Sequence, residues 1–242
     1  MIAAGCGCVL LSAYGIAYAY SLIVAFDSDV MPRNGAFPMP EEERQAPGTP
    51  RVPMTTAEIE AAHLGEARKL NGQVTLVEYD PQWPQVFERE AERIRDRLGH
   101  VEHRIEHVGS TSVPGLPAKP VIDMLLIVPD SADETAYVPP LEGIGFQLVI
   151  QEPEWYEHRV LRRHGLAPSA ESANLHVLST GCPEVGRMLR FRDRLRTHSG
   201  DRELYARTKR SLSQQSWQYM QNYADAKTEV VEEILGRAGH EA

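Results

Sequence analysis

The chain has 242 residues, of which 42% are apolar and 24% are charged, and this composition excludes disorder of the whole chain. The formal net charge of -9 at pH 7 argues against a protein that coats extended nucleic acid, because neutralising phosphates needs a basic surface. The three cysteines, Cys6, Cys8 and Cys182, form neither a zinc pattern nor a disulfide framework, which favours a reducing compartment.

The first 26 residues carry no charged side chain and are long enough to cross a bilayer as a helix. They lack the positive start of a secretory signal, and a proline-rich linker follows to residue 53. Two alternatives stay open: a membrane anchor through residues 2–26, or an artefactual extension ahead of a translation start at Met54. We favour the second, which predicts a cytoplasmic protein, with a membrane as partner only if residues 1–26 are real.

A first helix is predicted over residues 54–72, where Thr55 or Thr56 can cap it and Glu58 can complete a capping box. Residues 73–238 are expected to form one domain. Strand patterns occur at 73–79, 101–108, 120–128, 146–150, 158–163 and 174–179. Helical patterns occur at 84–98, in a short segment before 146, and at 183–197, 201–213 and 215–236. This alternation, followed by a helical tail, predicts an α+β domain around a mixed sheet flanked by helices.

The strongest candidate site begins at the turn between the predicted strands 101–108 and 120–128. Gly109 and Ser110 can present backbone N–H groups and a hydroxyl to an anion, and Gly109 allows a phosphate close to the backbone. Asp123 lies inside the apolar run 120–128, which reads as a strand buried on both faces. Its carboxylate could hold a Mg²⁺ ion that bridges bound phosphates.

Four segments of the sequence resemble the GrpB family: YDPQWP at 79–84, HVGSTSVPGLPAKPVIDMLLIV at 107–128, NLHV at 174–177 and FRDRLRTHSGDRELYARTKRSL at 191–212. The resemblance covers roughly residues 74–213. It implies the nucleotidyltransferase fold, which in this family occurs alone or fused to dephospho-CoA kinase. It also implies a pocket for a nucleotide or another phosphorylated small molecule, but it names no substrate and no oligomeric state.

The sequence departs from the nucleotidyltransferase pattern at one position that matters for chemistry. Those enzymes carry two carboxylates one residue apart on this strand, so that both share metal ions, whereas Leu125 stands at the second position. Glu106 and Asp193 are the candidates for a second acid supplied from elsewhere. An equally weighted alternative makes Asp123 a buried acid that pairs with a basic side chain such as Lys119 or Arg192.

A basic stretch near the C-terminus offers candidate partners for phosphate groups. Nine basic residues fall within 187–210, namely Arg187, Arg190, Arg192, Arg194, Arg196, Arg202, Arg207, Lys209 and Arg210. Many such residues form salt bridges on a solvated helix face, and we assign Arg187 and Arg194 to that class. Arg192 and Arg196 lie nearer the apolar face and are expected to recognise phosphate.

Two hypotheses follow for the function. In the first, the chain is a nucleotidyltransferase in which Ser110 and Asp123 are catalytic and Asp123 binds Mg²⁺. The phosphate or nucleotide would be held by Gly109, Ser110, Thr111, Lys119, Arg192 and Arg196, with His107, His176, Glu106 and Asp193 as further pocket residues. In the second, the chain is a catalytically degenerate nucleotide- or phosphate-binding module, as the leucine at position 125 suggests.

Overall fold

The structure is a computed structural model that describes residues 52–166 and 169–239, all within the second of two compact units, residues 42–242. The apolar segment at 1–26 and nearly all of the linker lie outside the described residues, so the two alternatives for them stay predictions. None of the helices in the described part has the length and apolar character that crossing a membrane requires.

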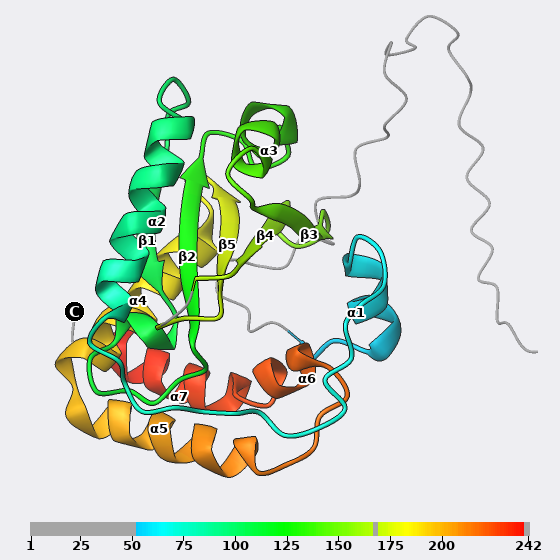
Figure 1. Cartoon of the computed structure of the whole chain (residues 1–242). Helices are drawn as coiled ribbons and strands as arrows, with labels where there is room; N and C mark the ends of the chain where they lie inside the picture. Colours follow the sequence, from blue (N-terminus) through cyan, green and yellow to red (C-terminus); the bar gives the residue numbers. More distant parts are fainter. Residues whose placement is uncertain (1–51, 167–168, 240–242) are drawn as a thin grey trace, which may run out of the picture. The chain divides into compact units, whose positions relative to one another are not determined.

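A five-stranded sheet forms the centre of the domain, in the order β1-β2-β5-β4-β3 (Figure 1). β2 and β5 run parallel and the other neighbours are antiparallel, so the sheet is mixed. The strands are β1 (Arg104–Val108), β2 (Val121–Val128), β3 (Gln147–Glu152), β4 (His158–His164) and β5 (Ser172–Ser179). The prediction of an α+β fold with a mixed sheet flanked by helices and a C-terminal helical tail is confirmed.

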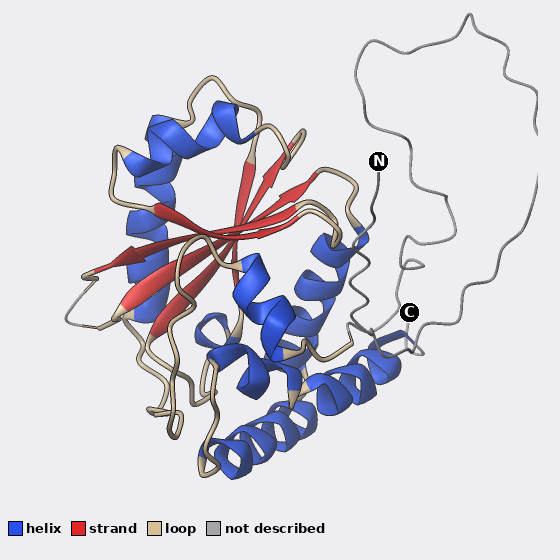
Figure 2. Ribbon diagram, turned by 90° about the vertical axis from the view of Figure 1, so that its right-hand side faces the viewer, coloured by secondary structure: helices blue, strands red, loops and turns tan. Residues whose placement is uncertain are grey.

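Helices cover both faces of this sheet, as its edge-on view shows (Figure 2). The helices are α1 (Thr56–Ala62), α2 (Trp83–Arg97), α3 (Glu134–Glu142), α4 (Pro183–Thr197), α5 (Ser199–Ser213), α6 (Met220–Asp225) and α7 (Thr228–Gly239), with a short 3-10 turn η2 (Ser110–Ser112). Apolar side chains of α2 and α3 pack on one face. Those of α4 pack on the other, and α5 and α7 join α4 in a second core cluster.

The central strand β2 explains where the candidate site lies. Its even-numbered residues from Ile122 to Val128 face the core under α2 and α3, whereas Leu125 and Ile127 pack under α4. Because side chains alternate along a strand, Asp123 shares the α4 side of the sheet with Leu125. It is the one polar position on an otherwise apolar strand, at the end nearest the turn η2.

The N-terminal helix begins as predicted but is shorter. Thr55 is the cap, its hydroxyl accepts a hydrogen bond from the Glu58 backbone N–H, and the Glu58 side chain completes the capping box. The helix ends at Ala62 rather than continuing to residue 72. Beyond it the chain is extended, and the backbone of Gly72 pairs with that of Trp217.

Two secondary-structure predictions are wrong. Residues 73–79 form no strand, and only Val77 makes an isolated bridge, to Ala118. Two residues after Ala118, Pro120 lacks the N–H group that would make the next ladder bond, and two residues before it the Leu116 N–H group bonds to Val113 instead. The single helix expected over 215–236 begins only at Met220, because the backbone of Trp217 pairs with that of Gly72, and it is divided at Ala226 and Lys227 into α6 and α7.

Candidate functional site

The turn after β1 and the acid of β2 are in direct contact. Val108 pairs with Asp123 across the two strands, which brings Gly109 beside the Asp123 carboxylate. Gly109 has φ 67°, and a Cβ atom added to it would stand 2.5 Å from Oδ2 of Asp123. Glycine is therefore required here both by the backbone conformation and by the carboxylate. The Asp123 side chain is 31% exposed, so it is partly open to solvent rather than in a closed core.

A buried lysine from α5 holds the next residue of the turn. Nζ of Lys209 donates a hydrogen bond to Oγ of Ser110 at 2.9 Å and another to the carbonyl oxygen of Pro117. Tyr205, one turn earlier on α5, also hydrogen-bonds to Ser110. Lys209 is only 2% exposed, and a buried ammonium group is costly unless an anion is nearby. Its position links α5 to the candidate site.

Four cationic side chains lie close enough to Asp123 for its negative charge to raise their pKa: Lys119, Arg162, Lys209 and Lys227. We call these four residues the cationic cluster. Burial outweighs that effect and lowers the pKa of all four, to about 7 for Lys209 and for Lys227. Asp123 is the one carboxylate that acts on all four, while Glu171 acts on Lys119 and Asp225 on Lys227, so cations outnumber carboxylates and the cluster favours a further negative charge.

A chain of polar contacts leads from Asp123 across the sheet. Asn174 on β5 donates from Nδ2 to Oδ1 of Asp123 at 3.0 Å, and Nε2 of His176 lies 4.0 Å from the same oxygen. Nδ1 of His176 contacts Nε2 of His158 on β4 at 3.1 Å, and Nδ1 of His158 lies 2.7 Å from Oε2 of Glu152 on β3. Burial and the neighbouring His158 lower the pKa of His176 to about 4, so His176 is neutral at pH 7.

The side chains around Asp123 do not fit a Mg²⁺ ion. Mg²⁺ requires six oxygen ligands, and in proteins these usually include one or two carboxylates together with the phosphates of the substrate. Leu125, the next residue on the same side of β2, is fully buried. The Asn174 amide points its N–H group, not its oxygen, at Asp123. No group of three or more His, Cys, Asp or Glu residues within 52–166 and 169–239 could hold a metal ion. The nearby cations would repel a divalent ion as well.

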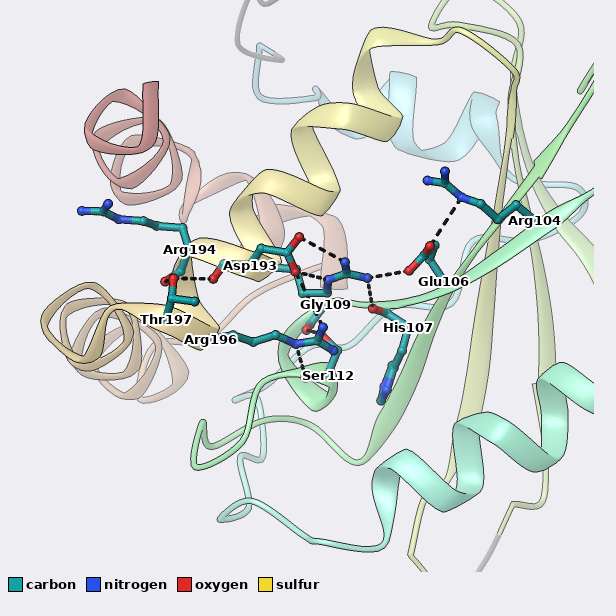
Figure 3. Close-up of polar contacts among 10 residues, drawn as sticks. Arg104, Glu106, His107, Gly109, Ser112, Asp193, Arg194, Arg196 and Thr197 are labelled. Carbon is teal, nitrogen blue, oxygen red and sulfur yellow. Dashed lines mark hydrogen bonds and ion pairs between the residues drawn. The ribbon is translucent and has the colours of Figure 1, made fainter. Parts of the chain in front are cut away.

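The two acids that sequence reasoning offered as second ligands are held by one arginine. Nη1 of Arg192 donates to Oε2 of Glu106 at 2.8 Å and to the His107 carbonyl oxygen at 3.1 Å, and Nε donates to Oδ1 of Asp193 at 2.7 Å. Figure 3 shows Glu106 of β1 and Asp193 of α4 pointing toward the same guanidinium group. These hydrogen bonds link α4 to the edge strand β1. The carboxylates of Glu106 and Asp193 therefore both bind Arg192.

Three other predicted site residues lie away from Asp123. His107 is on the opposite side of β1, where its ring stacks on Phe87 at 4.6 Å and Nε2 contacts Oγ1 of Thr111 at 3.1 Å. Thr111 is itself buried and turned toward His107. Arg196 supports the turn, since its Nε donates to the carbonyl oxygen of Ser112 at 3.0 Å (Figure 3).

The structure thus brings together Gly109, Ser110, Lys119, Asp123 and His176 from the predicted set. It adds five residues that sequence reasoning did not assign to the site: Arg162, Asn174, Tyr205, Lys209 and Lys227. One pattern could have identified the lysine of α5. Tyr205, Ala206 and Lys209 follow at helical spacing on the buried face of that helix, where a lysine is unexpected without a partner.

Comparisons with known proteins agree with this architecture. The family model described as "GrpB protein" matches residues 73–237. A UPF0157 protein of Halalkalibacterium halodurans is 52% identical over 200 residues, covering 83% of this chain and 98% of the relative. A UPF0157 protein of Streptomyces coelicolor is 38% identical over 192 residues, covering 79% and 95%. The crystal structure of conserved protein GrpB from Enterococcus faecalis matches with TM-score 0.59 and 30% identity, covering 69% of this chain and 98% of that one.

Proposed function

The chain belongs to the GrpB family, and we propose on that basis that it binds a phosphorylated small molecule, such as a nucleotide, through cationic side chains rather than through a Mg²⁺ ion. The observation that carries this proposal is the environment of Asp123. Asp123 is the one carboxylate that acts on all four residues of the cationic cluster, which outnumber the carboxylates around them. A phosphate group would supply the negative charge that this arrangement lacks.

The local geometry suits an anion in three ways. Gly109 is exposed and has no side chain to keep a phosphate oxygen away from the backbone. The Ser110 hydroxyl, fixed by Lys209, can share in a hydrogen bond with the same anion. The positive charge is local, in a chain whose formal net charge is -9, so general attraction to polyanions does not explain it.

Binding through lysines and binding through Mg²⁺ predict opposite effects of the metal. In the proposed site, the full chain binds pyrophosphate in EDTA, and added Mg²⁺ weakens binding because the metal competes for the anion. A nucleotidyltransferase that uses Asp123 as a metal ligand binds the same anion only when Mg²⁺ is present. Isothermal titration calorimetry of pyrophosphate and of ATP, each with EDTA and with Mg²⁺, separates the two functions. If neither pyrophosphate nor ATP binds under either condition, the proposal is wrong.

Neutralising the acid gives a second, independent distinction. Asp123→Asn removes the negative charge closest to the bound anion, so at pH 6, below the pKa of Lys209 and Lys227, pyrophosphate affinity in EDTA should rise severalfold. If Asp123 is a metal ligand, the same change abolishes the binding seen with Mg²⁺. Glu88→Gln, an exposed position on α2, changes the net charge equally and serves as the control, with no expected effect on affinity. Thermal melting of both variants checks that each is folded.

A further inference from the structure

A cavity of about 310 Å³ lies between the sheet and the helices α1, α4, α6 and α7, next to the cationic cluster. Its volume is at the lower end of the range for sites that hold small molecules. Lys227 and His176 line this cavity. Lys227 is itself a member of the cationic cluster, and Nε2 of His176 is 4.0 Å from Asp123. The cavity therefore adjoins the candidate phosphate site through Lys227 and His176.

The wall of the cavity is largely aliphatic and aromatic. The partly exposed part of this wall consists of Ile150, Trp155, Met188 and Val231, whereas Ile59, Val160 and Leu178 also line the cavity but are at most 3% exposed. Apolar surface of this kind gains free energy when a ligand displaces water from it, by roughly 25 cal/mol for each Å² covered. A bound molecule with an apolar body would therefore fit better than one that stays fully hydrated.

Several polar groups in the lining are already hydrogen-bonded to one another. His158 contacts both Glu152 and His176 through its two ring nitrogens. Arg187 is paired with Glu184 and Glu232, and Asp225 accepts hydrogen bonds from Gln221 and from the backbone of Met54. Groups that are paired in this way do not need a ligand to satisfy them. The lining thus offers more to a hydrocarbon chain than to the polar edge of a nucleobase.

We infer that the ligand is a phosphate monoester with an aliphatic body, its phosphate at the cationic cluster and its chain in the cavity beside His176. This inference rests on the proposed phosphate binding and assigns the rest of the ligand. The charge of the cluster fixes one end of the molecule, and the apolar wall accepts the other. The volume of the cavity limits the length of chain that can be covered.

The test is a series of alkyl phosphates titrated into the full chain in EDTA, by isothermal titration calorimetry below micellar concentrations. Methyl, butyl, hexyl and octyl phosphate carry the same charged group. Affinity should rise roughly fourfold for each added methylene until the cavity is filled, and then level off. Nonspecific binding of detergent-like molecules would give no such plateau. AMP, with the same phosphate charge, should bind more weakly than hexyl phosphate.

A matched pair of variants tests where the alkyl chain of the ligand binds. Ala224→Trp puts a large side chain at an exposed position that lines the cavity, and it should remove the gain from longer chains while inorganic phosphate binds as before. Ala226→Trp, two residues later, does not line the cavity and should leave the series unchanged. If affinity does not change with the length of the alkyl chain, or if AMP binds more tightly than hexyl phosphate, the inference is wrong. The proposed phosphate site is unaffected by that result. Loss of all phosphate and pyrophosphate binding overturns both.

Discussion

The carboxylate of Asp123 packs against the backbone of Gly109, so that a Cβ atom at residue 109 would lie 2.5 Å from Oδ2 and 2.8 Å from Cβ of Asp123. The contact follows from the strand pairing, because Val108 is opposite Asp123 and the chain turns directly afterwards. A side chain at residue 109 would have to move the acid away from Asn174 and from the cationic cluster. The turn and the acid are therefore one structural unit.

Gly109→Ala should destabilise the protein more than the equivalent change at another left-handed glycine. Gly115 has φ 78° and no atom within 4 Å of its added Cβ, so Gly115→Ala should lose only about 1–2 kcal/mol from the backbone conformation. Gly109→Ala adds the collision with Asp123, which we expect to cost a further ~1–3 kcal/mol. Urea unfolding of both variants measures the difference, and equal losses would show that Asp123 moves aside easily.

Anion binding should weaken as the pH rises through neutrality. The pKa values of Lys209 and Lys227 are lowered to about 7, mainly by burial, so both lysines lose positive charge between pH 6 and pH 8.5. Sulfate is the suitable probe because its own charge is constant over this range. Its affinity should fall by roughly tenfold for each lysine that loses its charge, in titrations at fixed ionic strength.

Lys209→Arg is the control for this pH dependence, because arginine keeps its charge at pH 8.5. The variant should bind sulfate with a shallower pH profile than the unaltered chain. Lys69→Arg, at an exposed lysine between α1 and α2, should leave the profile unchanged. If sulfate affinity is constant from pH 6 to pH 8.5 in the unaltered chain, the buried lysines do not form the anion site.

The parts of the fold that the sequence predicted are those in which local pattern and tertiary environment agree. The run at 120–128 is apolar on both faces because β2 is central, and the helix at 183–197 has a periodic apolar face that packs on the sheet. The segment 73–79 has the composition of a strand, but its partner cannot continue the ladder beyond Ala118, because Pro120 has no N–H group and the Leu116 N–H group bonds to Val113. No local pattern in 73–79 reveals that its partner lacks these donors.

The candidate site likewise has a part that the sequence predicted and a part that only the packing of the fold reveals. Gly109, Ser110, Lys119 and Asp123 lie within one short segment, so their spacing predicted that they would meet. Lys209 and Lys227 come from the C-terminal helical region about a hundred residues later and are brought in by packing of α4, α5 and α7. The predicted phosphate ligand Arg192 instead binds Asp193 of its own helix and Glu106 of β1, and the sequence of α4 alone did not reveal the acid on the strand.

Arg192 should contribute to stability and not to anion binding. Arg192→Met removes the hydrogen bonds to Glu106, Asp193 and the His107 carbonyl group, for an expected loss of about 1–3 kcal/mol in urea unfolding. Its sulfate affinity should match that of Arg190→Met, an exposed position on the same helix. Lys119→Met, in contrast, should weaken sulfate binding by roughly tenfold. If Arg192→Met weakens sulfate binding tenfold, Arg192 belongs to the phosphate site.

Acidification should unfold the protein partly through His107. The pKa of His107 is lowered to about 3, first by burial and then by the charges of Arg196 and Arg192. The unfolded chain has a His pKa of about 6.5. Above pH 6.5 neither state binds the proton, and below it the unfolded state binds one that the folded state excludes, so stability falls as the pH drops from about 6.5 toward 3.

Replacing this histidine tests the assignment. His107→Gln keeps a hydrogen-bonding side chain beside Thr111 but has no group that titrates, so its unfolding free energy should fall less steeply than that of the unaltered chain between pH 6.5 and pH 4. The difference in slope should approach about 1.4 kcal/mol per pH unit. His100→Gln, in an exposed position after α2, should keep the original slope. Urea unfolding at half-unit pH steps measures all three proteins, and parallel curves for the unaltered chain and His107→Gln would show that His107 is protonated in the folded state.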